Sequence, residues 1–399
     1  MEPFFALARR RRWEGLIVLV VLLIAIFAFA EIGIDYEYNS VSKVESENEV
    51  FPLAEPEPAK FVATHIETPE SVRGVYMTSW LGGVRDTGGK FYARDNLIEL
   101  INETELNSIV IDIKDDTGQI GFEVFDPELK KIGSETNRIP DIREFIKELH
   151  GNNIYVIGRV AVFQDPYLVK LRPELAIKRA SDGIIWRDRK SLTWLDPGAR
   201  GVWDYIIQIA RDSYASGFDE IQFDYIRFPT DGNLQDISYP FFDSAILTRA
   251  DQMKQFYVYM GKELGGQVPI SADLFGLTTT ALDDMGMGQI FENVAPHFDF
   301  ISPMVYPSHY AAGSYGYQDP NLYPYEIVKA ALDGGVAKLS AASTSPNKLR
   351  PWLQDFDYGG RYDATAVRAQ INATYDAGLN SWLLWDPSVK YEKDALYLE

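Results

Sequence analysis

The feature that most constrains this fold is a repeated alternation of short β-rich runs with helical patterns. It occurs about eight times from residue 71 onward, which is typical of parallel strands joined by crossover helices. Because eight parallel strands can close on themselves, the sequence predicts an α/β protein, a (β/α)₈ TIM barrel. The expected strands are residues 74–80, 108–115, 154–163, 220–228, 269–276, 300–306, 350–356 and 381–386.

Helix punctuation supports this alternation. Asp95 is expected to cap a helix over residues 96–106. A helix over residues 202–216 is expected to end at Gly217, directly before the fourth strand, and Gly378 precedes the last strand in the same way. A helix that stops at glycine and feeds a strand is the connection that such a barrel repeats.

An open, doubly wound sheet would alternate in the same manner. Such sheets usually carry a glycine-rich phosphate loop after the first strand. Residues 81–83, Leu-Gly-Gly, lack the Gly-x-Gly-x-x-Gly spacing, so the barrel is the preferred prediction.

The first seventy residues have a different character. Arginines at 9–12 precede an apolar run at 16–30, so residues 1–34 are expected to be a signal peptide or a transmembrane anchor. Residues 35–70, rich in Glu, Ser, Asn and Pro, are expected to be a flexible linker, and residues 71–399 to be the barrel. If the apolar run is retained, it contacts the membrane and the arginines stay cytoplasmic. The expected location is therefore the cell membrane with the domain outside, or secretion.

Composition removes several classes of function. The 58 acidic and 38 basic residues among 399 give a net charge of −20, which would repel a phosphate backbone, so nucleic acid is not an expected partner. Without cysteine there is no disulfide, thiolate metal site or cysteine nucleophile. The histidines lack the spacing of a zinc site, so no metal or other cofactor is expected; they are His65, His150, His297 and His309.

The predicted fourth strand carries charges that a buried strand normally excludes. Asp224 lies near its carboxyl end, and Arg227 follows three residues later. In a parallel barrel that end is the active-site face. Taken alone, Asp224 is better explained as a structural aspartate that pairs with Arg227 or caps the next turn. Polar residues at the ends of the other strands reverse that preference, because together they would line a pocket. The expected substrate-binding residues are Tyr76, Trp80, Asp112, Lys114, Asp115, Arg159, Trp194, Arg227, Tyr306, His309, Gln354, Trp385 and Asp386.

Two of the strand-end carboxyl groups suit glycoside hydrolysis, which uses a carboxylate and a protonated carboxyl group on either side of the scissile bond. Asp224 and Asp273 come from neighbouring strands, which lie about 4.8 Å apart in a sheet. Asp224 is the expected nucleophile or electrostatic stabiliser, and Asp273 the expected acid/base. Asp273 could equally bond a loop amide, and Asp112, Asp115 and Asp116 are rivals for either role.

Tryptophans offer a second function. The long loop at 164–196 contains Trp186 and Trp194, which could stack on sugar rings or simply pack within the loop. With Trp80 and Trp385, they allow a catalytically inactive barrel that binds surface polysaccharide. A third possibility is an envelope scaffold that binds no glycan.

Several motifs together resemble a known family. Segments 74–78, 110–118, 155–159 and 223–229, and later 271–276, 302–310 and 382–387, resemble the bacterial putative glycosyl hydrolase domain family over roughly residues 71–386. The resemblance implies a TIM barrel distantly similar to the α-amylase-like glycosidases, with Asp224 at the position of their strand-four nucleophile. Those enzymes commonly use a glutamate as acid after strand five, where this chain has Asp273. The resemblance does not indicate a substrate. The expected export and an aromatic fraction of 13% suggest a cell-envelope or extracellular polysaccharide or oligosaccharide.

Overall fold

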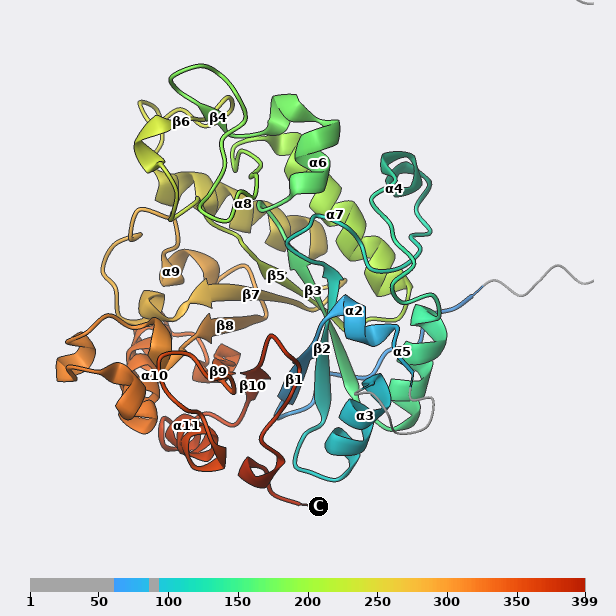
Figure 1. Ribbon diagram of the computed structural model, residues 1–399, viewed down its shortest axis with the longest axis vertical. Coiled ribbons are helices and arrows are strands. Elements are labelled where there is room, and N and C mark those ends of the chain that lie inside the picture. Colours follow the sequence, from blue (N-terminus) through green and yellow to red (C-terminus); the bar gives the residue numbers. More distant parts are fainter. Residues whose placement is uncertain (1–60, 86–92, 399) are drawn as a thin grey trace, which may run out of the picture. The chain divides into compact units, whose positions relative to one another are not determined.

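Eight parallel strands form a closed barrel in the computed structural model, which describes residues 61–85 and 93–398 (Figure 1). Around the barrel the order is β1, β2, β3, β5, β7, β8, β9 and β10, which returns to β1. The predicted (β/α)₈ barrel is therefore confirmed, with every expected strand present. The strands are β1 (Arg73–Met77), β2 (Ser108–Lys114), β3 (Tyr155–Ala161), β5 (Glu220–Asp224), β7 (Ile270–Phe275), β8 (Phe300–Met304), β9 (Trp352–Gln354) and β10 (Trp382–Trp385).

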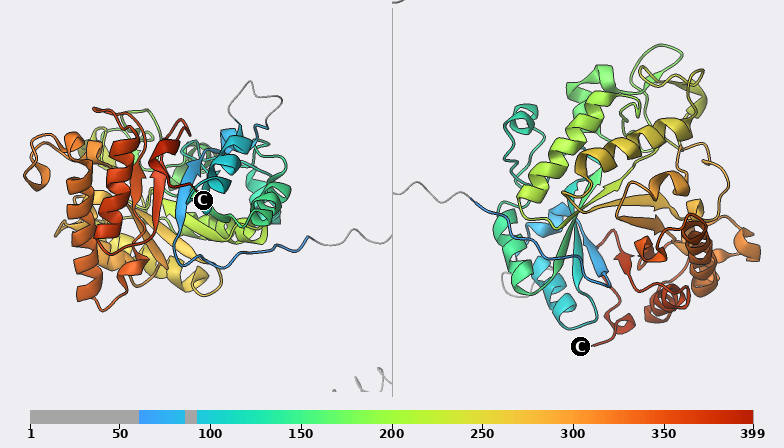
Figure 2. Two further views of the ribbon diagram at one scale, coloured as in Figure 1. Left: turned by 90° about the horizontal axis from the view of Figure 1, so that it is seen from below. Right: turned by 180° about the vertical axis from the view of Figure 1, so that it is seen from behind.

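Helices surround the strands on the outside, as the three views show (Figures 1 and 2). A small antiparallel pair, β4 (Lys178–Arg179) with β6 (Ile237–Ser238), joins the long insertions after β3 and β5. The α-helices are α2 (Ser79–Gly82), α3 (Arg94–Asn102), α4 (Pro127–Ile132), α5 (Ile142–Gly151), α6 (Pro166–Leu171), α7 (Arg200–Ala215), α8 (Arg249–Leu264), α9 (Phe291–Val294), α10 (Pro324–Ala341) and α11 (Ala364–Asp376).

Alternate residues of each strand pack on opposite sides of the barrel wall. Val75 and Ile109 belong to the large hydrophobic cluster that includes the helices, whereas Tyr76 and Val110 belong to a smaller separate cluster. Because strand side chains alternate, the smaller cluster fills the barrel interior. Every residue of β2 is buried, as expected where both faces of a parallel sheet are covered.

The amino-terminal end of the barrel interior holds a buried polar network. Glu220 accepts hydrogen bonds from Arg350 Nη2 at 2.6 Å, from Ser271 at 2.5 Å and from Tyr155 at 3.1 Å. All four residues are buried. This network satisfies the Glu220 carboxylate far from the strands' carboxyl ends, so the interior charges at those ends form a separate group.

Two details of the helix punctuation differ from the prediction, and two agree. Asp95 is not the cap of α3: the helix begins at Arg94, and Asp95 lies in its first turn, where a negative charge favours the helix dipole. The helix also ends at Asn102 because the chain turns there toward β2. Gly217 and Gly378 adopt the positive φ angles, +117° and +81°, that glycine tolerates best before a strand.

The folded region begins before residue 71. Within the expected linker, the Ile66 N–H donates to Asp219 Oδ1 at 2.7 Å, and the Thr68 hydroxyl lies 3.0 Å from that of Tyr155. Asp219 and Tyr155 stand at the amino-terminal ends of β5 and β3, so this segment crosses that end of the barrel. The expected anchor or signal and the remainder of the linker, residues 1–60, lie outside the described residues. Within the described part of the chain, no helix is long and apolar enough to cross a bilayer.

Candidate active site

One arginine gathers three carboxylates at the carboxyl ends of the strands. The guanidinium of Arg159, on β3, donates from Nη1 to Asp112 Oδ1 at 2.7 Å and from Nη2 to Asp224 Oδ2 at 2.5 Å. Its Nε lies 3.8 Å from Asp273 Oδ2. Asp112, Asp224 and Asp273 come from three different strands, and all are buried. The convergence is a property of the closed barrel and not of a local sequence motif.

Strand register brings the predicted catalytic pair together. Phe223 of β5 pairs with Ala272 of β7, so the next residues along each strand are Asp224 and Asp273. Both point inward by alternation, as their shared contact with Arg159 shows. Parallel neighbours at equal height present their side chains side by side.

A strained turn directly after β5 helps to fix the position of the Asp224 side chain. It ends β5, and the next residue, Tyr225, has a φ of +54°, a left-handed conformation that non-glycine residues adopt at some cost. In this turn the Tyr225 N–H donates to Asp224 Oδ1 at 2.6 Å. The expected alternative of a pair with Arg227 is not observed, because Asp224 pairs with Arg159 instead.

Asp273 is more completely enclosed than Asp224, although the two are level in the sheet. Its side chain accepts a hydrogen bond from Trp352 Nε1 at 2.8 Å, and the residue is only 1% exposed. Burial, with a further contribution from the charge of Asp224, raises the pKa of Asp273 well above its usual range, although Arg159 and Trp352 act in the opposite direction. Asp273 therefore faces the barrel interior and holds its proton more tightly than an ordinary aspartate does.

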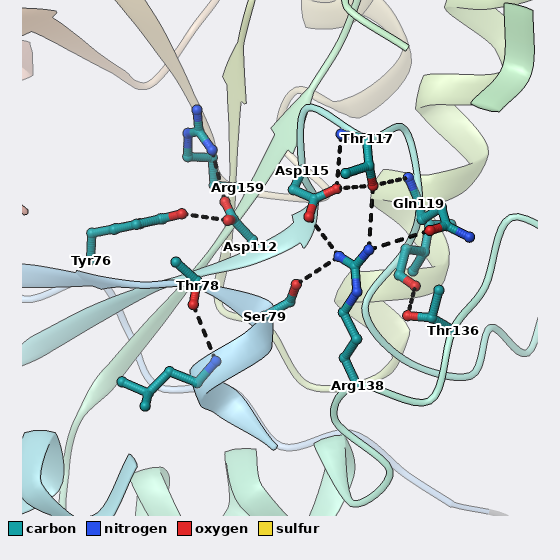
Figure 3. A network of polar contacts seen from close by, with 12 residues as sticks. Tyr76, Thr78, Ser79, Asp112, Asp115, Thr117, Gln119, Thr136, Arg138 and Arg159 are labelled. Carbon is teal, nitrogen blue, oxygen red and sulfur yellow. Dashed lines mark hydrogen bonds and ion pairs between the residues drawn. The ribbon is translucent and has the colours of Figure 1, made fainter. Parts of the chain in front are cut away.

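Asp112 is fixed by two donors, one to each of its carboxylate oxygens. Besides Arg159, it accepts a hydrogen bond from the Tyr76 hydroxyl at 2.5 Å (Figure 3). The Tyr76 ring stacks on Trp385, with centroids 3.9 Å apart and planes 23° apart. Burial raises the pKa of Asp112 as well. Among the rival carboxylates, Asp112 is the one that lies beside the predicted pair, where it orients Arg159.

A cavity of about 430 Å³ opens beside Asp224. Its wall combines apolar and aromatic side chains with polar and charged ones. The lining residues are Asp224, Tyr225, Arg227, Phe275, Gly276, Leu277, Met285, Met287, Met304, Tyr306, His309, Tyr310, Ala311 and Ser314.

A second, larger hollow of about 1000 Å³ shares Tyr306 and His309 with the first. These two side chains therefore border both hollows. The second is lined by Lys190, Tyr306, Ser308, His309, Asp355, Phe356, Asp357, Tyr358, Tyr362, Trp385, Asp386, Pro387, Ser388, Lys390 and Glu392.

Several residues expected to bind substrate lie at these hollows. Arg227 lines the first, Trp385 and Asp386 line the second, and Tyr306 and His309 line both. Burial lowers the pKa of His309.

Trp80 has a separate, exposed position. It follows β1 in α2, is 63% exposed, and stacks over the guanidinium of Arg138 at 4.1 Å. An exposed indole held by a guanidinium offers a flat surface to a ligand.

Two charged residues after Asp112 do not fit the expected role in substrate binding. Lys114 is fully buried and pairs with Asp165, the cap of α6, at 2.8 Å. Asp115 accepts from Arg138 at 2.6 Å and from Thr117, in a loop network seen in Figure 3. Neither Lys114 nor Asp115 lines the two hollows described above. The structural explanation, a charge network at the strand end, holds for both.

Gln354 and Trp194 also serve structure and not ligand contact. Gln354 is fully buried, accepts the Ser308 N–H and donates to the Phe356 carbonyl. Trp194 is 2% exposed and donates to Asp188. Trp186, the other loop tryptophan, is 1% exposed and donates to a backbone carbonyl. For both tryptophans, the loop-packing explanation fits and the sugar-stacking one does not.

The structure adds residues that were not among the expected site residues. Trp352 reaches Asp273 from β9, and Tyr225 lines the first hollow. Asp355 lines the second; burial raises its pKa to about 8, and its Oδ1 has no hydrogen-bond partner among the described residues. Its place at the end of the seventh barrel strand was the available sequence signal. No sequence signal marked Trp352 as a site residue, because a tryptophan within an apolar strand is expected to belong to the core.

The described residues contain no group of three or more His, Cys, Asp or Glu side chains that could hold a metal ion. The chemistry that this site offers comes from its carboxyl groups and arginines.

A closed barrel with carboxyl groups converging at the carboxyl ends of its strands is the architecture of many TIM-barrel glycoside hydrolases. Residues 74–391 match the family described as "Putative glycosyl hydrolase domain", and the chain belongs to this family. The resemblance drawn from the motifs is thereby confirmed. Comparison with curated proteins gave no match.

Solved structures show the same barrel. The glycoside hydrolase domain of PgaB (BpsB) from Bordetella bronchiseptica is 16% identical, with a TM-score of 0.53 over 82% of this chain and 99% of that domain. The α-L-fucosidase isoenzyme 2 from Paenibacillus thiaminolyticus is 12% identical, with a TM-score of 0.54 over 82% of this chain and 48% of the fucosidase. A hypothetical protein from Ruminiclostridium thermocellum ATCC 27405 is 38% identical over 50% of this chain and 96% of its own, with a TM-score of 0.43. At these identities, the two enzymes share the fold with this chain.

Proposed function

We propose that the protein is an extracytoplasmic glycoside hydrolase that cleaves a cell-envelope or extracellular polysaccharide. The observation that carries this proposal is the pair Asp224 and Asp273, which contact the same guanidinium from adjacent strands in two different environments. When two neighbouring carboxyl groups lie in different environments, one can stay protonated while the other is ionised. The protonated group then acts as the acid, and the ionised one as the base or nucleophile. Export rests on the expected signal or anchor at residues 1–34.

The two aspartates take different roles in this proposal. Asp224 is ion-paired with Arg159 and lines the first hollow, so it is the nucleophile or electrostatic stabiliser. Asp273 retains its proton because of burial and is the acid/base. Arg159 lies between them and balances the negative charge that the pair would otherwise accumulate.

A polymer fits the shape of the site better than a single sugar. Two hollows that share Tyr306 and His309 as lining residues give room for more than one sugar unit. Trp80 and Trp385 offer aromatic surfaces to the apolar faces of sugar rings.

A second candidate, an inactive barrel that binds polysaccharide, is favoured by one observation. Asp273 is 1% exposed and does not line the first hollow, so a proton donor at this position lies below the cavity surface. Binding would then rest on Trp80 and Trp385, because Trp186 and Trp194 are packed inside the loop.

The two candidates separate in one experiment on the full-length protein. Isolated envelope polysaccharides are incubated with wild type and with Asp224→Asn, and products are identified by mass while binding is measured by co-sedimentation. We expect Asp224→Asn to lower the cleavage rate by at least about 100-fold and to retain binding, because the variant removes the reacting carboxylate and not the aromatic surfaces.

The matched control is Asp141→Asn, which also removes an aspartate paired with an arginine, Arg94, at 2.5 Å, but outside the barrel. It should cleave like wild type. Equal behaviour of Asp224→Asn and wild type in both assays would rule out the enzyme.

A further inference from the structure

Arg227 brings a positive charge to the wall of the first hollow. It follows β5 by three residues and lines the same cavity as Asp224. Its guanidinium carbon lies 4.9 Å from the ring centre of Phe275, 5.0 Å from that of Trp194 and 5.5 Å from that of Tyr225. Cation–π contact with the three rings stabilises the guanidinium at this position.

The charge of Arg227 is favoured only from a distance, by the carboxylates of Asp224, Asp231 and Asp188, and not by a direct ion pair among the described residues. Its hydrogen bonds among the described residues come from Nη1 and reach neutral acceptors, the Phe228 carbonyl at 3.1 Å and the Thr230 hydroxyl at 3.2 Å. No ion pair is found for it in the part of the chain that the structure describes. Arg159, by contrast, donates its hydrogen bonds to the carboxylates of Asp112 and Asp224. Burial lowers the pKa of Arg227, which reflects the cost of holding this charge away from water.

The Arg227 charge is surrounded by apolar side chains in the wall of the hollow. Phe275, Leu277 and the methionines at 285, 287 and 304 line the same hollow. These apolar side chains offer no hydrogen bonds to a neutral sugar, whose hydroxyl groups would lose water without replacement where they pack against them. An anion beside Arg227 would gain a strong, poorly screened interaction in the same place.

We propose that this hollow binds a sugar unit carrying a carboxylate, and that Arg227 recognises this carboxylate, so that the polysaccharide substrate is acidic. The planar guanidinium matches a carboxylate in geometry as well as charge. Asp224 in the same hollow would repel the sugar's carboxylate, which favours an orientation with that group toward Arg227 and the anomeric carbon toward Asp224. This inference names the substrate class of the proposed hydrolase and rests on that proposal.

The test compares sugars that differ only at C6, without requiring cleavage. Binding of glucuronate and glucose, galacturonate and galactose, and mannuronate and mannose to the full-length protein is measured by saturation-transfer NMR and titration. We expect at least one uronate to bind roughly 10-fold or more tightly than its neutral partner. Arg227→Gln should bring that uronate to the affinity of the neutral sugar.

Arg249→Gln is the matched control. Arg249 also donates to a backbone carbonyl, that of Gly286, and also lies over aromatic rings, those of Phe228 and Tyr239. It does not line the hollow, so its variant should keep the uronate preference.

Two further measurements keep the outcome decisive. The uronamide of the preferred sugar has the same shape without the charge, and it should bind as weakly as the neutral sugar even if Arg227→Gln fails to fold. Cleavage of polysaccharide by wild type is measured separately, so its absence would count against the hydrolase and not against this recognition. Equal affinity of all three uronates and their neutral partners, or a preference that survives in Arg227→Gln, would overturn the inference.

Discussion

At the scale of single residues, the site works through unequal environments for similar side chains. Arg159 and Arg227 stand near the same carboxylate, yet one is saturated with carboxylates and the other is not. Asp224 borders open space, whereas Asp273 is enclosed by the barrel. The burial of a side chain and the donors around it therefore decide its role, more than its residue type does.

Asp355 gives a prediction about pH and stability. Burial raises its pKa to about 8 from an ordinary value of 3.8. The unfolded chain releases this proton above about pH 4 while the folded chain keeps it, so the stability linked to Asp355 is complete below pH 4 and is lost as pH rises toward 8. Asp355→Asn cannot ionise and can still accept the Glu392 N–H. We expect it to raise the free energy of unfolding at pH 7 by on the order of 2 kcal/mol, and to change little at pH 4.

Urea denaturation of wild type and Asp355→Asn at the two pH values measures this difference. Asp357→Asn, an aspartate of the same hollow that accepts the Tyr362 N–H, is the control. An equal stability difference at pH 4 and pH 7 would contradict the account.

At the scale of elements, one buried ion pair joins the end of β2 to the start of α6. Lys114 and Asp165 are both fully buried and lie 2.8 Å apart, and Asp165 also caps α6 through the Leu168 N–H at 2.7 Å. Lys114→Met should lower the free energy of unfolding by about 3–5 kcal/mol, because Asp165 is left as an unpaired buried charge. Lys114→Met with Asp165→Asn should recover much of this loss, since asparagine can keep the cap.

Chemical denaturation of the single and double variants tests this prediction. Lys329→Met removes an exposed ion pair with Asp333 and should cost less than about 1 kcal/mol. If the double variant were as unstable as Lys114→Met alone, the unpaired charge would not be the cause.

Strand β2 also shows which features of the structure could not be predicted from the sequence. The strands could be predicted because they are apolar runs bounded by helix-stop signals, and Asp112 and Arg159 lie near the predicted strand ends. Lys114 was expected to line the pocket because it is a polar residue near the end of its strand, two residues after Asp112. The pairing of β2 with β3 shifts between Asp112 and Lys114, and this irregularity breaks the alternation.

At the scale of the whole molecule, barrel closure assembles a site that no segment contains. Asp112, Arg159, Asp224 and Asp273 are more than 40 residues apart along the chain in each consecutive pair. Their grouping followed from the predicted barrel, because the carboxyl ends of all strands meet at one face. The shape of that face could not be predicted in the same way. Trp194 lies in the expected loop yet is packed inside it, since it bonds to Asp188 of the same loop and contacts the ring of Tyr225, which follows β5.

The central claim is that Asp273 holds a proton inside the barrel while it shares Arg159 with Asp224. The most direct test is a carbon-13 NMR titration of aspartate carboxyl groups in wild type, with Asp273→Asn used to assign the signal. We predict a carboxyl signal, missing in Asp273→Asn, that stays protonated well above pH 4 and moves to lower pH in Asp224→Asn, because the charge of Asp224 raises the pKa of Asp273. An Asp273 signal that titrates near pH 4 and ignores the change at Asp224 would contradict the account.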